Sequence, residues 1–80
     1  MIKVVLYSTW GCHLCEQAET VLGNAGITFR VVDIVDDDQL FQQFRLHIPV
    51  VAAAESLLYW PFNEIAVLNW ANEIKAKDTK

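Results

Sequence analysis

Two cysteines stand three positions apart in the run Cys12-His13-Leu14-Cys15, and the chain contains no others. Thiols at this spacing exchange with disulfides or hold a metal ion. An apolar segment ends just before the run and a helical pattern begins within it, so we expect Cys12 at the helix N-cap or in its first turn. The unpaired N–H groups and the positive dipole end found there stabilise a thiolate and lower the thiol pKa.

The expected placement suits thiol–disulfide exchange. Cys15 would lie one turn further along the same helix face, close enough to form a disulfide with Cys12. Cys12 would attack a disulfide, and Cys15 would resolve the mixed disulfide. Zinc is the rival use, but a structural zinc site usually takes four ligands, and His47 is the one histidine outside the motif. We therefore predict a redox pair and no metal site, with a pair of buried structural thiols as the remaining alternative.

Three residues beside the cysteines are candidates for the substrate-binding surface. Gly11 gives the turn backbone freedom next to the sulfur. Trp10 would either form a wall of an exposed site or join the core. If His13 is cationic, it would lower the pKa of Cys12, although the helix end disfavours an imidazolium; the alternative is an exposed spacer.

The elements that must position these residues follow from the pattern of apolar side chains. Runs rich in β-branched residues predict strands, and apolar residues at spacings of three and four predict helices. In chain order we predict a strand at 2–7, a helix from Cys12 to the Gly23–Gly26 segment, a strand at 27–34, a helix starting at the 36–38 acidic run, strands at 50–54 and 57–60, and a helix from Asn63 to about Lys75. The first strand–helix–strand unit implies a parallel strand pair.

Two details of these elements follow from the residues. The first helix should bury an apolar stripe made of Leu14, Ala18, Val21, Leu22 and Ala25. The last two strands should form an antiparallel hairpin, because only Glu55-Ser56 lies clearly between them.

The three consecutive aspartates Asp36, Asp37 and Asp38 have two possible roles. Carboxylates favour a helix N-terminus, and Asp36 with Gln39 resembles a capping box. Three adjacent carboxylates on one short loop make a poor metal cage, so we favour the cap.

Composition and charge limit the class of protein. The chain has 80 residues, 54% of them hydrophobic, and a net charge of −4. One domain spanning 1–80 is expected, and the hydrophobic fraction argues against disorder. The acidic balance without a Lys/Arg cluster argues against a nucleic-acid partner. No apolar run approaches the ~20 residues of a membrane helix, and the N-terminus lacks the features of a secretion signal. We expect a monomeric cytoplasmic protein.

The element order β-α-β-α-β-β-α resembles the thioredoxin fold in its short glutaredoxin-type form. The residues that carry the resemblance are the run from Tyr7 to Cys15 and Ile48-Pro49-Val50; the Cys-His-Leu-Cys form, Asp33-Ile34 and Trp60-Pro61-Phe62 are similar to small glutaredoxin-like proteins of uncharacterised function. The resemblance covers essentially the whole chain. It implies an α/β fold with a four-stranded mixed sheet in the order 2-1-3-4, flanked by three helices.

The resemblance also implies roles for individual residues. Cys12 would be the nucleophile and Cys15 the resolving thiol. X-Pro bonds are mostly trans, and the residues alone favour that form for Pro49. The resemblance instead implies a cis Pro49 that faces the cysteines. The backbone of Ile48 would then pair with an extended substrate.

Partners follow from the same resemblance. A disulfide-containing protein or small molecule would be the substrate, and a reductase or thiol would donate electrons. Glutathione is a candidate co-substrate, but Thr9 stands where many glutaredoxins have a lysine, and Phe62-Asn63-Glu64 replaces their Gly-Gly turn and acidic pair. Glutaredoxins usually have Thr-Val-Pro where this chain has His47-Ile48-Pro49. His47 would either contact the thiolate or substrate or be a solvated loop residue. A non-catalytic binding or redox-sensing adaptor is the alternative function.

Overall fold

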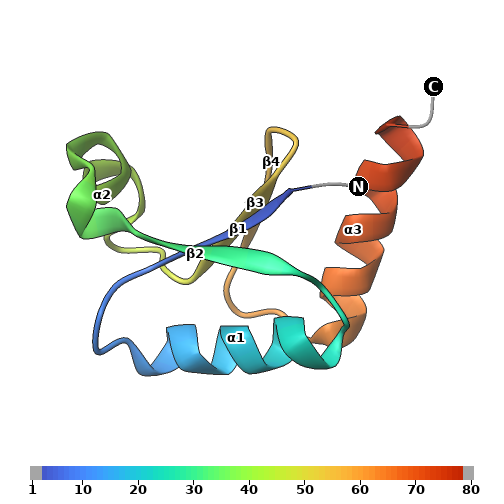
Figure 1. The fold of residues 1–80 in the computed structure, drawn as a ribbon, viewed down its shortest axis with the longest axis horizontal. Helices are drawn as coiled ribbons and strands as arrows, with labels where there is room; N and C mark the ends of the chain where they lie inside the picture. The colour runs from blue at the N-terminus through green and yellow to red at the C-terminus, as the bar shows by residue number, and fades with distance from the viewer. Residues whose placement is uncertain (1–2, 79–80) are drawn as a thin grey trace.

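Four strands form one mixed sheet in the computed structural model, which describes residues 3–78 (Figure 1). The elements are β1 (Val4–Ser8), α1 (His13–Asn24), β2 (Phe29–Asp33), a short 3₁₀ turn η1 (Ile34–Asp36), α2 (Asp38–Phe44), β3 (Val50–Ala53), β4 (Ser56–Tyr59) and α3 (Glu64–Asp78). The strand order is β2-β1-β3-β4, with β1 parallel to β2 and antiparallel to β3, and β3 antiparallel to β4. The predicted α/β thioredoxin-type fold is confirmed.

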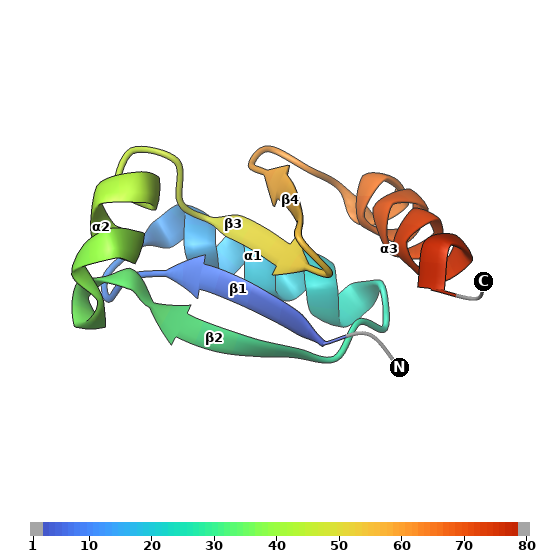
Figure 2. The ribbon, with the colours of Figure 1, turned by 90° about the horizontal axis from the view of Figure 1, so that it is seen from above.

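The helices divide between the two faces of the sheet. The larger core joins β1 and β3 to α1 and α3, whereas the smaller core lies under α2; the buried members of the larger core are Val4, Leu6, Ala18, Leu22, Val51, Ala53, Phe62, Val67, Trp70, Ala71 and Ile74. Val50 belongs to the smaller core and Val51 to the larger one, because successive strand residues point to opposite faces. Seen from above, α1 lies beneath the sheet and α2 lies at one end of it (Figure 2).

The β3–β4 hairpin differs by one residue from the prediction. Its turn is Ala54-Glu55, and Ser56 already pairs with Ala53 in the sheet. Both turn residues have positive φ angles, 48° for Ala54 and 64° for Glu55. A two-residue turn of this kind matches the right-handed twist of the flanking strands. The twist of the strands therefore decides the turn, although neither residue is the glycine or asparagine that would signal it.

The cap of α2 also corrects the prediction. Asp37, not Asp36, is the N-cap, and its Oδ1 accepts hydrogen bonds from the N–H groups of Gln39 at 2.9 Å and Leu40 at 3.1 Å. Asp36 instead ends the 3₁₀ turn that precedes the helix. Three adjacent aspartates offer similar caps, and only the path of the chain after β2 selects one.

The cap of α3 confirms the prediction. Asn63 Oδ1 accepts a hydrogen bond from the N–H of Ala66 at 2.8 Å. The helix continues to Asp78, about one turn beyond the predicted end at Lys75. Within residues 3–78, no helix combines the length and the apolar character that crossing a membrane requires.

Candidate active site

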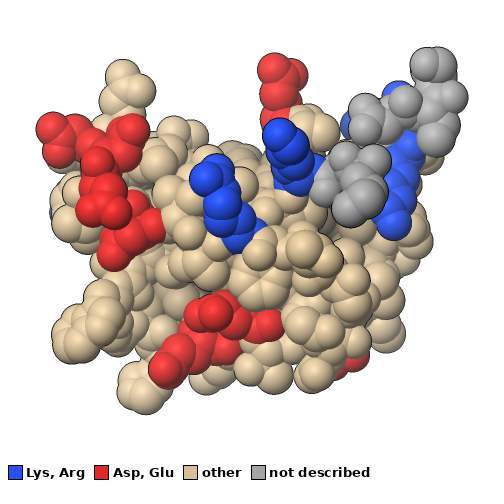
Figure 3. All heavy atoms as spheres, viewed as in Figure 1, with Lys and Arg blue, Asp and Glu red and all other residues tan. Residues whose placement is uncertain are grey.

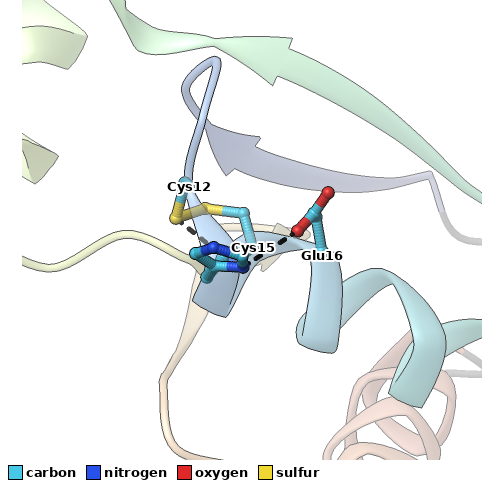
Figure 4. Close-up of a disulfide and its surroundings, with 4 residues drawn as sticks. Cys12, Cys15 and Glu16 are labelled. Carbon is cyan, nitrogen blue, oxygen red and sulfur yellow. Dashed lines mark hydrogen bonds and ion pairs between the residues drawn. A yellow bond between two sulfur atoms is a disulfide. The ribbon is translucent and has the colours of Figure 1, made fainter.

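A disulfide joins Cys12 to Cys15 where the chain passes from β1 into α1 (Figure 4). Cys12 is the N-cap of α1, with an extended backbone (φ −89°, ψ 108°), and Cys15 lies in the first turn. The two Cα atoms are 5.2 Å apart, a usual separation for a disulfide. The sequence-based expectations of an N-cap Cys12 and a close pair are thus both met by the local backbone.

The backbone beside the disulfide supplies a hydrogen-bond donor to one sulfur. The N–H of Cys15 donates to Cys12 Sγ at 3.1 Å. This N–H belongs to the first helical turn, where no backbone carbonyl of the helix is available to it. A donor at that position, together with the positive end of the helix dipole, favours negative charge on Cys12 once the disulfide is reduced.

The two sulfurs differ in their exposure to solvent. Cys12 is partly exposed, whereas Cys15 is only 2% exposed. A disulfide approaching from solvent can therefore reach Cys12 but not Cys15. This asymmetry separates the group that can attack an external sulfur from the group that can attack only its neighbour.

The buried face of α1 passes through Cys15, Ala18 and Leu22. The prediction that Leu14 belongs to this face was wrong, because its side chain is 44% exposed. The helix begins with its inner face at Cys15, and Leu14 is turned about 100° away from that residue around the axis. The same rotation buries the sulfur of Cys15 and leaves a leucine exposed next to the motif.

Residues on either side of the cysteines are exposed. Trp10 is 93% exposed, in agreement with a wall of the site rather than a core residue. Gly11 has a φ of +77° and open space around the position of a Cβ, so the turn requires its backbone conformation and not its small size. His13 is also 93% exposed at its side chain, and its Nδ1 lies 3.4 Å from Glu16 Oε2.

The Ile48-Pro49 peptide bond is cis, as the resemblance implied and the residues alone did not. Pro49 is fully buried, and Ile48 packs against the smaller core. The N–H of Ile48 donates to the carbonyl of Phe44 at 3.0 Å. The Ile48 N–H is therefore not free to donate to a substrate backbone. Of the pairing expected at Ile48, only its carbonyl remains as an acceptor.

His47 lies on the loop before Pro49 and is exposed. Its ring meets that of Tyr59 edge to face, with centroids 5.7 Å apart. This contact places His47 against β4 and supports a loop role. Among residues 3–78, no three His, Cys, Asp or Glu side chains are grouped in a way that could hold a metal ion.

A hollow of about 370 Å³ opens beside the disulfide, and its lining comes from the end of β1, the following turn and α1: Ser8, Thr9, Trp10, Gly11, Cys12, Cys15, Glu16 and Glu19. Of the predicted site residues, Trp10, Gly11 and the two cysteines meet here. His13, Ile48 and Pro49 are not part of this lining within the described structure.

Sequence reasoning missed the two carboxylates of the hollow. Glu16 and Glu19 each follow one of the cysteines by four residues. Residues four apart share a face of a helix, so the spacing contained the signal that places these carboxylates beside the sulfurs.

The chain is similar to one curated protein and to several solved structures. It is 26% identical over 89 residues to the N-acetyl-S-hydroxy-L-cysteine reductase of Bacillus subtilis (strain 168), a match that covers 100% of this chain and 96% of the relative. The X-ray structure of protein XcR50 from X. campestris superposes with a TM-score of 0.82 at 33% identity, covering 88% of this chain and 96% of that one. Thioredoxin 1 from Thermosipho africanus TCF52B, at 18% identity and a TM-score of 0.61, covers 98% of this chain and 99% of its own and shares the fold.

Residues 3–72 match the sequence profile of the glutaredoxin-like domain (DUF836). That span holds the disulfide, the hollow beside it and the cis Ile48-Pro49 bond. The match, the disulfide and the relative named as a reductase together support a thiol–disulfide redox function in general terms. By its sequence and its fold, this chain belongs to the glutaredoxin-like domain family.

Proposed function

We propose that this chain is a thiol–disulfide oxidoreductase in which Cys12 is the nucleophile and Cys15 the resolving thiol. The observation that carries the proposal is the asymmetry of the pair. Cys12 is partly exposed and accepts a hydrogen bond from the Cys15 N–H, whereas the Cys15 sulfur is buried behind it. Attack from outside and resolution from inside follow from these two environments.

The reaction proceeds in two exchanges. The Cys12 thiolate attacks one sulfur of a substrate disulfide, forms a mixed disulfide and releases the other sulfur as a thiolate, which takes up a proton. Cys15 then loses its proton and attacks the Cys12 sulfur, which releases the second substrate thiol. The protein is left with the Cys12–Cys15 disulfide, and a dithiol or reductase donor restores both thiols.

A sulfenic acid is a second candidate substrate. The B. subtilis relative carries a name that describes a reductase of an S-hydroxy cysteine derivative. The Cys12 thiol can displace the hydroxyl of such a compound as water, which gives the same mixed disulfide for Cys15 to resolve. Both candidate reactions use Cys12 and Cys15 and differ in the leaving group. The relative's compound also carries a carboxylate, whereas the acidic lining of the hollow in this chain favours a sulfenic acid without one.

We expect glutathione to be a poor electron donor for this protein. Thr9 provides no positive charge at the position where many glutaredoxins have a lysine. At the start of α3, the side-chain oxygen of Asn63 already accepts a hydrogen bond from the N–H of Ala66. A dithiol donor or a reductase fits the site better than a tripeptide that needs cationic groups.

A trapping experiment tests the proposal. With Cys15 replaced by serine, resolution is blocked, and incubation with bis(2-hydroxyethyl) disulfide should give a stable adduct on Cys12 detected by mass spectrometry. The matched Cys12→Ser variant should form far less adduct under the same conditions. If the two variants react equally, the assignment of nucleophile and resolving thiol is wrong.

Turnover separates the enzyme from the adaptor alternative. The unmodified protein, supplied with a dithiol donor system, should reduce many equivalents of disulfide. Oxidation that stops after one equivalent would instead support a redox sensor or a binding module.

A further inference from the structure

We infer that the hollow beside the disulfide selects low-molecular-weight disulfides that carry a positive charge near the sulfur and disfavours those that carry a negative charge. The inference rests on the proposed function, because it names the class of substrate for the same site. The reaction is the exchange described above: the reduced dithiol becomes the Cys12–Cys15 disulfide, and the substrate disulfide becomes two thiols.

Among the residues that the structure describes, the charged groups that line the hollow are all acidic. Glu16 and Glu19 contribute carboxylates, and the other lining residues between Ser8 and Cys15 are neutral. The disulfide lies in the same lining, so a substrate whose sulfur reaches Cys12 has its nearest substituents beside these carboxylates. The hollow is large enough for such a substituent, at about 370 Å³.

Trp10 adds an aromatic surface to the same hollow. Its side chain is 93% exposed and lines the site together with the carboxylates. The face of an indole ring attracts a cation. The ring therefore favours the same sign of charge as the two glutamates.

The charge of the whole molecule reinforces that of the hollow. Asp33 pairs in register with Ser8, at the end of β1 that leads to the cysteines, and the acidic run 36–38 follows. The cations Lys3 and Arg30 lie at the opposite end of the same strand pair, since Lys3 precedes β1 and Arg30 pairs with Val5. Acidic atoms gather over the α2 end and over α1, whereas basic atoms lie toward the middle and the α3 side (Figure 3).

Other charged side chains near this end do not reverse the pattern. Arg45 follows α2 and is exposed, but it is not part of the lining of the hollow in the described structure. His13 contacts Glu16 through Nδ1, and its side chain is not part of the lining of the hollow in the described structure.

The expected preference can be sized from Coulomb's law. A unit charge ~8 Å from a carboxylate in water changes the encounter by about twofold, upward for a cation and downward for an anion. Two carboxylates therefore predict a cation-to-anion ratio of roughly 16-fold at low ionic strength. The ratio should fall to about threefold or less at 0.5 M salt, because the Debye length becomes shorter than the separation of the charges.

Three small disulfides test the inference: cystamine is cationic, bis(2-hydroxyethyl) disulfide is neutral and N,N′-diacetyl-L-cystine is anionic. The rate constant of the reduced protein with each probe is divided by that of dithiothreitol with the same probe, which removes differences in intrinsic reactivity. We expect the normalised rates to follow the order cationic, neutral, anionic. The Glu16→Gln/Glu19→Gln double variant should reduce the cation-to-anion ratio to about threefold or less.

The matched control is Glu73→Gln, which removes one exposed carboxylate from α3 and should leave the ratio as it is. Equal normalised rates for the three probes, or faster reduction of the anionic probe, would overturn the charge preference while leaving the oxidoreductase proposal in place. Failure of the protein to reduce even the neutral probe would instead count against the proposed function itself.

Discussion

The most direct consequence of the site geometry is that Cys12 and Cys15 should differ as acids once reduced. The Cys15 N–H lies 3.1 Å from Cys12 Sγ, at the N-terminus of α1. A hydrogen bond to a charged group contributes about 1.5–3 kcal/mol, and the helix dipole about 0.3–1 kcal/mol. Because Cys12 is partly exposed, we discount the sum by about half, which leaves roughly 1–2 kcal/mol in favour of the thiolate. The ratio of thiolate to thiol should therefore rise about 5- to 30-fold over that of a free cysteine.

Two single-thiol variants isolate this effect. Cys15→Ser retains the backbone N–H that donates to Cys12, and Cys12→Ser leaves Cys15 alone. Rates of alkylation by iodoacetamide, followed by mass spectrometry across pH, give the midpoint of thiolate formation for each. We expect the pKa of Cys12 to lie below that of a cysteine peptide, and the buried Cys15 not to share this shift. In urea, where the helix is lost, the two midpoints should converge.

Equal midpoints for the two folded variants would refute this reasoning. That result would mean that the N–H and the helix end contribute nothing measurable to the thiolate. The choice of Cys12 as nucleophile would then depend on its exposure alone.

Two further predictions concern the elements that hold the site. Asn63→Ala removes the cap of α3 and should lower the free energy of unfolding by about 1 kcal/mol in urea titrations; Asn69→Ala, in the exposed middle of the same helix, should not lower it, and equal losses would argue against the cap. Glu55→Gly relieves a side chain held at a φ of 64° and should raise the melting temperature, with a gain of roughly 0.5–1 kcal/mol; a lower melting temperature would contradict the strain argument.

The fold was predictable because its signals are local and repeated. β-branched runs and a three-four apolar spacing located each helix and strand within a few residues, whereas the order of the strands in the sheet came from the resemblance to the thioredoxin fold. The predictions were wrong where neighbouring residues compete for one position, namely the cap of α2 and the buried face of α1. Asp36 and Asp37 are equally good caps in isolation, and the side chain of Leu14 is more apolar than the thiol of Cys15.

Some features of the candidate site were also predictable from the sequence, and others were not. Cys12 at a strand-to-helix junction, with Cys15 one turn later, followed from the sequence alone. The residues by themselves favoured a trans Pro49, and only the resemblance to a family implied the cis form found in the structure. The use of the Ile48 N–H by Phe44 required the path of a loop that no local pattern specifies.

By itself, the sequence predicted a thiol–disulfide redox pair at a helix N-terminus, because the reactivity of a thiol at that position depends mainly on the few residues that surround it in the chain. Only the tertiary structure decided which sulfur faces solvent, since burial of Cys15 depends on the rotation of α1 against the sheet. The tertiary structure also decided what surrounds the exposed sulfur of Cys12. The two glutamates, the exposed Trp10 and the acidic end of the sheet come together because β1 delivers the chain to the same edge as Asp33, which lies 21 residues beyond Cys12 in the sequence.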